Sequence, residues 1–326
     1  MQLSASSWMA ALGLEPLSLP TLELTPVSWT QTLLSYPPIK ALLPIPILLA
    51  IAPVLVWFFR ATWRKIDEEA TDYRSQNRGQ LDYRPAACLV ITAVVLTVQE
   101  YYGGRQFFQT TLRPELEELY LGPWPWLRLE RYDELYAYGW WCFSRSAGYV
   151  LLPLLTWKLL FPSDSLLDMG LRGRGFFEHL WVYAVCLGIV VPVMLIVAHQ
   201  PDFGSYYPFY KQSSRSIFDF MAWEAMYWVQ FFSLELFFRG WMVGALRHNL
   251  GSAAIFVMAV PYCMIHYGKP YLEAHGAIVA GVVLGSLAMR TRSIYAGFLL
   301  HITVALSMDL LSLYKRGAIP HNFWPE

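Results

Sequence analysis

Ionisable residues lie inside the apolar stretches of the C-terminal half of this 326-residue chain. Glu235 and Arg239 stand four positions apart in a run of Phe and Leu residues, so a helix would pair them on one face. His266 ends a second apolar stretch. His301 begins a third, and Asp309 follows eight positions later, near the same helix face. Because a charge at the centre of a helix in lipid costs at least about 2.5 kcal/mol, such residues are functional by default.

An acid, two histidines and an arginine on separate apolar stretches favour the activation of water. A carboxylate and a neutral imidazole can together deprotonate a water molecule held between them. A second imidazole can donate a hydrogen bond to the oxyanion that forms when this water attacks an amide. The sequence has no Ser in a GxSxG context and no polar Cys beside these groups that would indicate a covalent nucleophile. Taken singly, each residue also fits a structural role, such as an ion pair or an interhelical hydrogen bond.

Three short motifs contain these residues in a fixed order. They read Leu234-Glu235-xxx-Arg239-Gly240, Tyr262-xxx-His266 and His301-xxx-Ala305. Their order and spacing resemble those of the CPBP family, the CAAX-protease and bacteriocin-processing group of glutamic intramembrane proteases. The family motifs are EExxxR, FxxxH and HxxxN or HxxxD. The segments at 167–172 and 290–295 are also similar to the family, and the resemblance covers roughly residues 165–312.

The resemblance implies an intramembrane endopeptidase of the CPBP type, a hydrolase that uses activated water. It would cleave a peptide bond near the membrane-embedded or lipidated C-terminal region of a protein substrate. In such a site His266 would orient the water and His301 would stabilise the oxyanion. Arg239 would hold Glu235 in place.

The sequence departs from the family motifs at two positions. Leu234 stands where the family has its first glutamate, the usual base, and Ala305 stands where it has Asn or Asp. One interpretation is a catalytically inactive membrane scaffold or partner-binding protein on the same fold. The other is an active subfamily in which Glu235, as first choice, or Glu273, as second choice, serves as the base. In that case Asp309 would replace the missing polar partner one turn later. The sequence does not choose between the two glutamates.

Composition excludes most soluble proteins. The chain is 56% hydrophobic and 15% charged, with a mean hydropathy of +0.36, whereas soluble domains are about 25% charged. Its 24 Lys and Arg balance 24 Asp and Glu, so no excess of positive charge favours nucleic acid. Aromatic residues make up 16%, as expected where amphipathic rings sit at a membrane interface. We therefore predict an all-α polytopic membrane helix bundle of about eight transmembrane helices.

Long apolar runs predict the positions of these spans. They lie at about 42–59, 86–99 (continuing to 102), 138–161, 180–198, 218–246, 253–267, 277–289 and 294–313. The polar segment at 101–137 is expected to form an amphipathic surface helix or hairpin. We expect three parts: an N-terminal arm with about three spans at 1–164, a CPBP-like catalytic membrane domain at 165–313, and a C-terminal tail at 314–326.

Charge in the flanks predicts the orientation. Lys and Arg follow the first, third, fifth and seventh predicted spans, and none precedes Lys40. Short cytoplasmic flanks carry the excess of Lys and Arg, and an even number of spans with the N-terminus outside places all four of these basic clusters in the cytoplasm. We expect an integral protein of a prokaryotic plasma (inner) membrane.

No cofactor is expected. Zinc is possible, because His266, His301 and an acid could form a two-His-one-carboxylate site, but the lack of an HExxH motif disfavours it. The four cysteines lie far apart without a CxxC pair, which indicates free buried thiols. The expected partners are a membrane-anchored or C-terminally processed protein substrate and the lipid bilayer, and no nucleic acid. A transporter is disfavoured because the sequence has no internal repeat.

Overall fold

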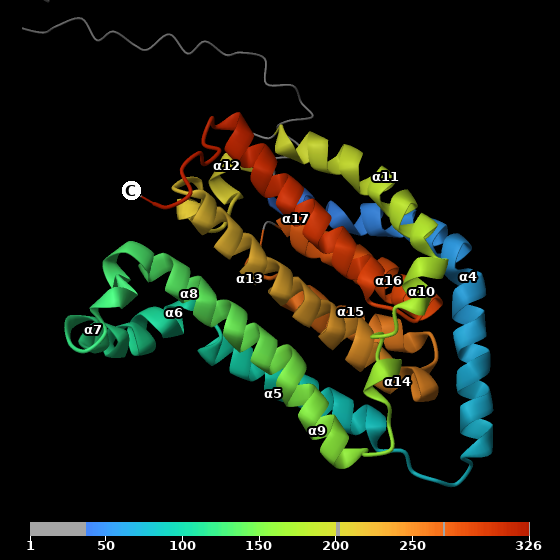
Figure 1. Cartoon of the computed structure of the whole chain (residues 1–326). Helices are drawn as coiled ribbons and strands as arrows, with labels where there is room; N and C mark the ends of the chain where they lie inside the picture. Colours follow the sequence, from blue (N-terminus) through green and yellow to red (C-terminus); the bar gives the residue numbers. More distant parts are fainter. Residues whose placement is uncertain (1–36, 200–202, 270, 326) are drawn as a thin grey trace, which may run out of the picture. The chain divides into compact units, whose positions relative to one another are not determined.

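The computed structural model describes residues 37–199, 203–269 and 271–325. The chain forms two compact units, Met1–Ile51 and Ala52–Glu326. The described part of the first unit is α3, Pro37–Leu42, and the beginning of α4, Pro44–Gln76. The remaining described helices belong to the second unit, which contains the candidate site (Figure 1).

After α4, the second unit continues with helices that pass through the predicted second and third spans. Pro85 lies in the first turn of α5, where a missing backbone N–H costs nothing. Within the segment at 101–137, a helical stretch over 105–121 is followed by a turn and by a second stretch that begins at Leu129 and packs back against the first. This is a helical hairpin, one of the two predicted forms. The second stretch continues without a break to Leu160. The bounds are α5 Arg84–Tyr102, α6 Arg105–Phe107, η1 Phe108–Leu112, α7 Arg113–Leu121, η2 Pro125–Leu127, α8 Leu129–Ser146, η3 Ala147–Leu151 and α9 Leu152–Leu160.

Short elements and one long apolar helix connect this part to the C-terminal half. They are η4 Leu166–Asp168, α10 Arg174–Glu178, α11 Leu180–Ala198, α12 Phe203–Tyr206 and η5 Lys211–Ser214. The C-terminal half consists of α13 Ile217–Glu235, η6 Leu236–Met242, α14 Val243–Leu250, α15 Ala253–Met264, α16 Tyr271–Thr291 and α17 Tyr295–Lys315. Helix α13 is capped at its start, where Ser216 Oγ accepts a hydrogen bond from the Asp219 N–H at 3.0 Å.

The fold is an all-helical membrane bundle, as the composition predicts. Within the described residues four helices are long and apolar enough to cross a membrane: α4, α5, the part of α16 from Ala274, and α17. Shorter apolar helices cover Leu180–Pro192 and Ala253–Met264. All eight predicted spans fall largely on helical segments of the structure. The protein is therefore an integral membrane protein.

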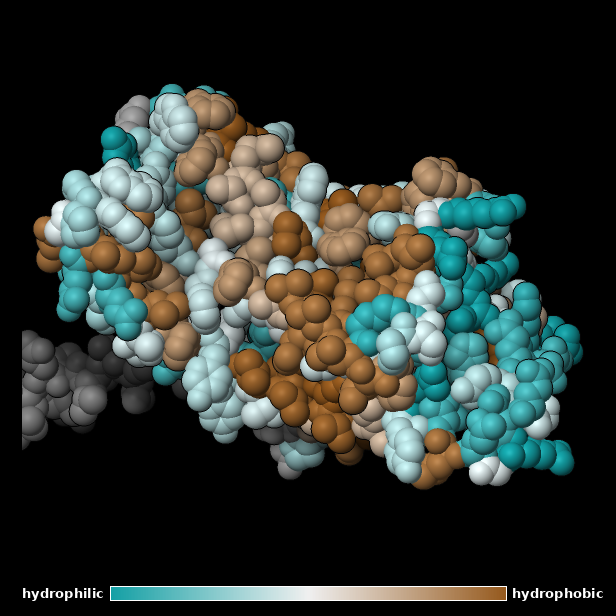
Figure 2. All heavy atoms as spheres, turned by 60° about the horizontal axis from the view of Figure 1, so that its bottom comes forward, coloured by the Kyte–Doolittle hydropathy of each residue, from teal (hydrophilic) through white to brown (hydrophobic). Residues whose placement is uncertain are grey.

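Helices far apart in sequence lie side by side around the candidate site. Helix α13 packs against α8 on one side and against α17 on the other, and α11 packs along α17 (Figure 1). Buried aromatic rings fill the centre, with Phe237 stacked on both Tyr149 and Trp241. Figure 2 shows a broad hydrophobic surface on one face, with hydrophilic side chains gathered at one end of it. Such a surface suits contact with lipid.

The two loop segments at 167–172 and 290–295 meet each other beside Gly240. Leu171 and Ser293 form an antiparallel bridge, and the Ile294 N–H donates to the Gly170 carbonyl at 3.0 Å. A Cβ at Gly240 would overlap the Met169 carbonyl oxygen. The Gly that follows Arg239 in the first motif therefore lets this junction reach the helix that carries Glu235 and Arg239.

Candidate active site

Glu235 and Arg239 form a buried ion pair. Glu235 is the last residue of α13, and Arg239 lies one turn later in η6, a π-helical turn of a kind found frequently at functional sites. Arg239 Nη1 lies 3.0 Å from Glu235 Oε1, and both side chains are almost completely inaccessible. Removal of either partner of such a pair is destabilising, because it leaves an uncompensated charge in the interior of the protein.

His301 joins this pair from α17. Its Nδ1 lies 3.0 Å from Glu235 Oε1, the same oxygen that contacts Arg239. The His301 ring stacks on Phe231 of α13, with centroids 4.9 Å apart and an angle of 6° between the planes. In contrast to its two partners, the His301 side chain keeps 21% of its surface accessible. It is therefore the member of the three that a substrate or water could reach.

Gly297 makes the approach of α17 possible. It lies one turn before His301, and a Cβ at this position would overlap the Glu235 carboxylate. Sequence analysis missed this residue. A small residue four positions before a histidine inside an apolar helix is the signal that could have identified it, because positions i and i+4 share a face.

Tyr262 lies between Arg239 and the second histidine of the motifs. The Arg239 guanidinium carbon lies 3.8 Å from the centroid of the Tyr262 ring. His266, just beyond the end of α15, packs edge-on against the same ring at 4.8 Å and contacts the Tyr262 carbonyl through Nδ1 at 2.8 Å. The structure thus connects His266 to the buried pair through one aromatic side chain.

Glu273 belongs to the first turn of α16, but its side chain is not among the described ones. Its role as a base stays a prediction. The described residues include no group of three or more His, Cys, Asp and Glu arranged to hold a metal ion. Since a metal site of His266, His301 and an acid could include Glu273, that hypothesis is also untested.

Asp309 of α17 also contacts α13, but at a different height along the two helices from the contact of His301 with Glu235. Its Oδ2 accepts a hydrogen bond from Trp223 Nε1 of α13 at 2.7 Å, and the carboxyl group is completely buried. Its side chain also contacts that of Glu224, which accepts a hydrogen bond from Trp228 Nε1 at 3.2 Å. Among the described residues it makes no hydrogen bond or ion pair with Glu235, Arg239 or His301.

Apolar packing surrounds the two positions that depart from the family motifs. Leu234 is 5% exposed and belongs to the large core cluster that contains Tyr149, Phe237 and Phe238. Ala305 is 6% exposed and lies in a cluster with Trp223 and Tyr227. Neither position therefore offers a polar group to the site.

The family comparison concerns the helices just described. Residues 217–307 match the family model described as type II CAAX prenyl endopeptidase Rce1-like. This segment is Rce1-like. The resemblance to the CPBP family is thereby confirmed. No curated protein and no solved structure gives a match.

The Rce1-like segment, residues 217–307, begins with α13 and ends within α17. It contains Glu235, Arg239, His266, Glu273 and His301, and it ends before Asp309. The ordered motifs are thus inside the matched segment.

Proposed function

We propose that the protein is an intramembrane endopeptidase of the CAAX-protease type. It would hydrolyse a peptide bond near the membrane-embedded or lipidated C-terminal region of a protein substrate. The observation that carries this proposal is the contact between Glu235 and His301, which joins two family motifs across α13 and α17 inside an apolar bundle. The Rce1-like match of the same segment supports it.

The geometry favours His301 as the group that takes the proton from water. An imidazole that donates from Nδ1 to a carboxylate keeps its lone pair on Nε2 while it is neutral. Glu235 would fix this tautomer and stabilise the imidazolium that forms, and Arg239 would keep Glu235 ionised. In this assignment His301 is the base, whereas the sequence predicts that role for Glu235 and the contact with the oxyanion for His301. Glu273 is the alternative base.

The reaction would then proceed through a tetrahedral intermediate. The oxygen of water bonds to the peptide carbonyl carbon while its proton moves to His301 Nε2. His266, in its protonated form, would donate a hydrogen bond from Nε2 to the oxyanion, because its Nδ1–H faces the Tyr262 carbonyl at 2.8 Å. One such donor contributes about 10²–10³ in rate. Collapse of the intermediate breaks the C–N bond, and His301 returns the proton to the leaving amine. No covalent enzyme intermediate is needed.

The setting proposed for this chemistry is the plasma (inner) membrane of a prokaryote, with the N-terminus outside. The basic residues that follow alternate spans support this orientation. No cofactor is required by the proposed steps. Elemental analysis of chelator-washed protein would test this, and stoichiometric zinc together with loss of activity on chelation would contradict it.

The test is cleavage of a farnesylated peptide with a C-terminal CAAX sequence by the purified full chain. His301→Ala and Glu235→Gln should each lower the cleavage rate by about 100-fold or more, since a general base contributes about 10²–10⁴. His266→Ala tests the proposed donor to the oxyanion, and Glu273→Gln tests the alternative base. His248→Ala is the control, because this histidine lies in α14 and packs at a tilt against Tyr73, with ring centroids 5.1 Å apart. Wild-type rates in all four site variants would contradict the proposal.

A second function is a non-catalytic membrane protein that binds a partner on the same fold. The burial of Leu234 and Ala305 in apolar clusters favours it, because the family's usual base is replaced by packing. It predicts that no peptide is cleaved by the wild type. It also predicts that Glu235→Gln lowers stability and leaves partner binding intact. Cleavage by the wild type that depends on His301 would contradict this alternative.

A further inference from the structure

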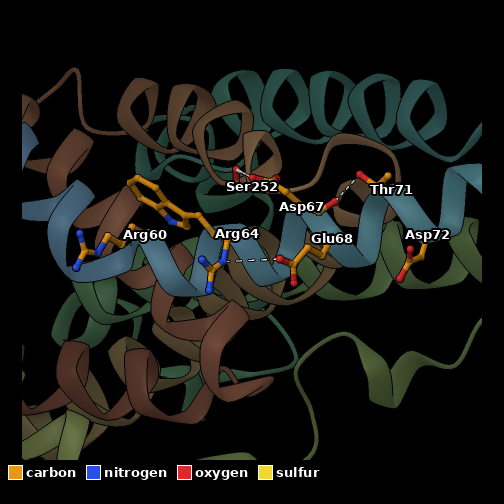
Figure 3. Close-up of a pocket in the computed structure, with 8 residues that line it drawn as sticks. Arg60, Arg64, Asp67, Glu68, Thr71, Asp72 and Ser252 are labelled. Carbon is orange, nitrogen blue, oxygen red and sulfur yellow. Dashed lines mark hydrogen bonds and ion pairs between the residues drawn. The ribbon is translucent and has the colours of Figure 1, made fainter.

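A shallow, open groove of about 530 Å³, lined by charged residues and one tryptophan, lies along α4 in the second unit. The lining residues are Arg60, Trp63, Arg64, Asp67, Glu68, Thr71 and Asp72 of α4, with Ser252 opposite (Figure 3). Residues 60, 64, 68 and 72 recur every four positions, so successive ones are neighbours and the four follow one oblique ridge of the helix, which turns by about 40° at each step. The groove therefore presents two cations followed by two anions along one line.

Part of this lining has a structural role. Asp67 accepts hydrogen bonds from the Ser252 N–H at 2.7 Å and from its hydroxyl at 3.1 Å, which ties α4 to the start of α15. Trp63 donates from Nε1 to Ser286 of α16 at 2.9 Å. These contacts fix the floor of the groove.

The remaining charges are available. Within the described part of the chain, the side chains of Arg60 and Asp72 have no hydrogen bond or ion pair, and Arg64 approaches Glu68 only to 3.7 Å. Both members of that pair are highly exposed, at 79% and 68% of their side-chain surface. Exposed pairs of this kind are weak, so a ligand carrying both charges could replace the contact.

The same face of α4 is apolar one turn earlier. Val56 is 52% exposed and Trp57 is 67% exposed, and both lie three or four positions before Arg60. Along this face the order is therefore apolar, basic, acidic. A phospholipid with a primary amine has the matching order of acyl chain, phosphate and ammonium. Four residues of helix advance about 6 Å, comparable to the separation of the two charges in such a headgroup.

We propose that this groove binds the headgroup of a zwitterionic phospholipid that carries a primary amine. Arg64 holds the phosphate and Glu68, four residues later, holds the ammonium, while Arg60 and Asp72 extend the basic and the acidic ends of the row. The acyl chains lie along Val56 and Trp57. The site is distinct from the one around Glu235, and its occupation does not depend on the proposed catalytic function.

The two acidic residues make the site selective. A primary ammonium donates three hydrogen bonds to carboxylates, whereas a trimethylammonium donates none. A phosphatidylglycerol headgroup would place hydroxyls, and no positive charge, beside Glu68 and Asp72. The expected order of affinity is therefore phosphatidylethanolamine, then phosphatidylcholine and phosphatidylglycerol.

Native mass spectrometry of the purified full chain with dioleoyl lipids tests this order. Phosphatidylethanolamine should bind about threefold or more tightly than the other two lipids, the range open to exposed ion pairs. The double variant Glu68→Gln/Asp72→Asn should lose this preference, and Arg60→Gln/Arg64→Gln should bind all three lipids more weakly. Arg78→Gln is the control, since Arg78 is exposed beyond the end of α4 and does not line the groove.

Three results would overturn the proposal. Equal binding of the three lipids by the wild type would remove the selectivity. A preference for phosphatidylethanolamine that survives in Glu68→Gln/Asp72→Asn would show that other residues cause it. Competition by soluble phosphoethanolamine at the same concentration as the lipid would show that the acyl chains take no part. Thermal melting without added lipid verifies that each variant is folded.

Discussion

His301 Nδ1 and Arg239 Nη1 both lie 3.0 Å from the same oxygen, Glu235 Oε1. These contacts join α17 to the junction of α13 and η6, which lies about 60 residues earlier in the sequence. Glu235 and Arg239 are buried and His301 is partly accessible, so the carboxylate lies against the imidazole and does not face solvent. This relationship leads to predictions about packing, charge and catalysis.

Gly297→Ala should disrupt the Glu235–His301 contact. The new Cβ would overlap the Glu235 carboxylate, so the side chain or α17 must move. We expect a stability loss of about 1–3 kcal/mol from overpacking. Cleavage should fall by about 100-fold, since small displacements of reacting groups have effects of this size.

Gly188→Ala is the control for this prediction. Gly188 lies in α11, and a Cβ there would meet no atom within 4 Å. Its melting temperature and activity should match the wild type. Normal cleavage by Gly297→Ala would argue that the close approach of α17 is unimportant for activity.

Arg239→Met should be strongly destabilising, by about 3–5 kcal/mol, because it leaves the Glu235 carboxylate buried without its counter-charge. Glu235→Gln/Arg239→Met should lose less, since neither charge remains. Thermal or denaturant unfolding in detergent measures both. Equal losses in the single and double variants would indicate that the effect of Arg239 comes from packing on Tyr262 and not from charge.

Asp309→Leu should destabilise the bundle by about 1–3 kcal/mol, because the Trp223 N–H would lose its acceptor inside the protein. Asp309→Asn keeps an acceptor oxygen and should cost less. Since Asp309 makes no polar contact with the Glu235 group in the described residues, Asp309→Asn should retain cleavage within about threefold. A folded Asp309→Asn protein without activity would instead support the sequence-based role of Asp309 in the site.

Asp164 should contribute to stability in a pH-dependent way. The Arg84 guanidinium hydrogen-bonds both carboxylate oxygens, at 2.9 and 2.7 Å, and this holds the pKa of Asp164 below its ordinary value of 3.8. Since the pKa is lower in the folded than in the unfolded state, the stabilisation is fully present above about pH 4. It is lost as the pH falls through the lower, folded-state pKa.

Asp164→Asn should therefore lower stability by about 1 kcal/mol at neutral pH, and the difference from wild type should shrink in acid. Melting temperatures across the acid range measure it. A difference that stays constant down to the acid limit would assign the effect to the loss of the Trp157 hydrogen bond to Asp164 Oδ2.

The periodicity of the sequence is sufficient to predict part of the candidate site. The four-residue spacing of Glu235 and Arg239 predicts an ion pair on one helix face, and the structure contains that pair. The spacing of His301, Ala305 and Asp309 predicts a shared face, and both ionisable residues do contact α13. The composition alone predicts a helical membrane bundle, because only helices or closed barrels satisfy their backbone groups in lipid.

Only the tertiary structure decides which residues meet across helices. Helix α17 runs antiparallel to α13, so eight residues of α17 carry Asp309 about 12 Å along the pair, from the level of Glu235 to that of Trp223. A sequence indicates the face of a helix through its period, but the level at which a partner lies depends on how two surfaces pack. That packing depends on close approaches such as the one at Gly297, where the sequence places a small residue on the face of His301 but does not show that the Glu235 carboxylate meets it.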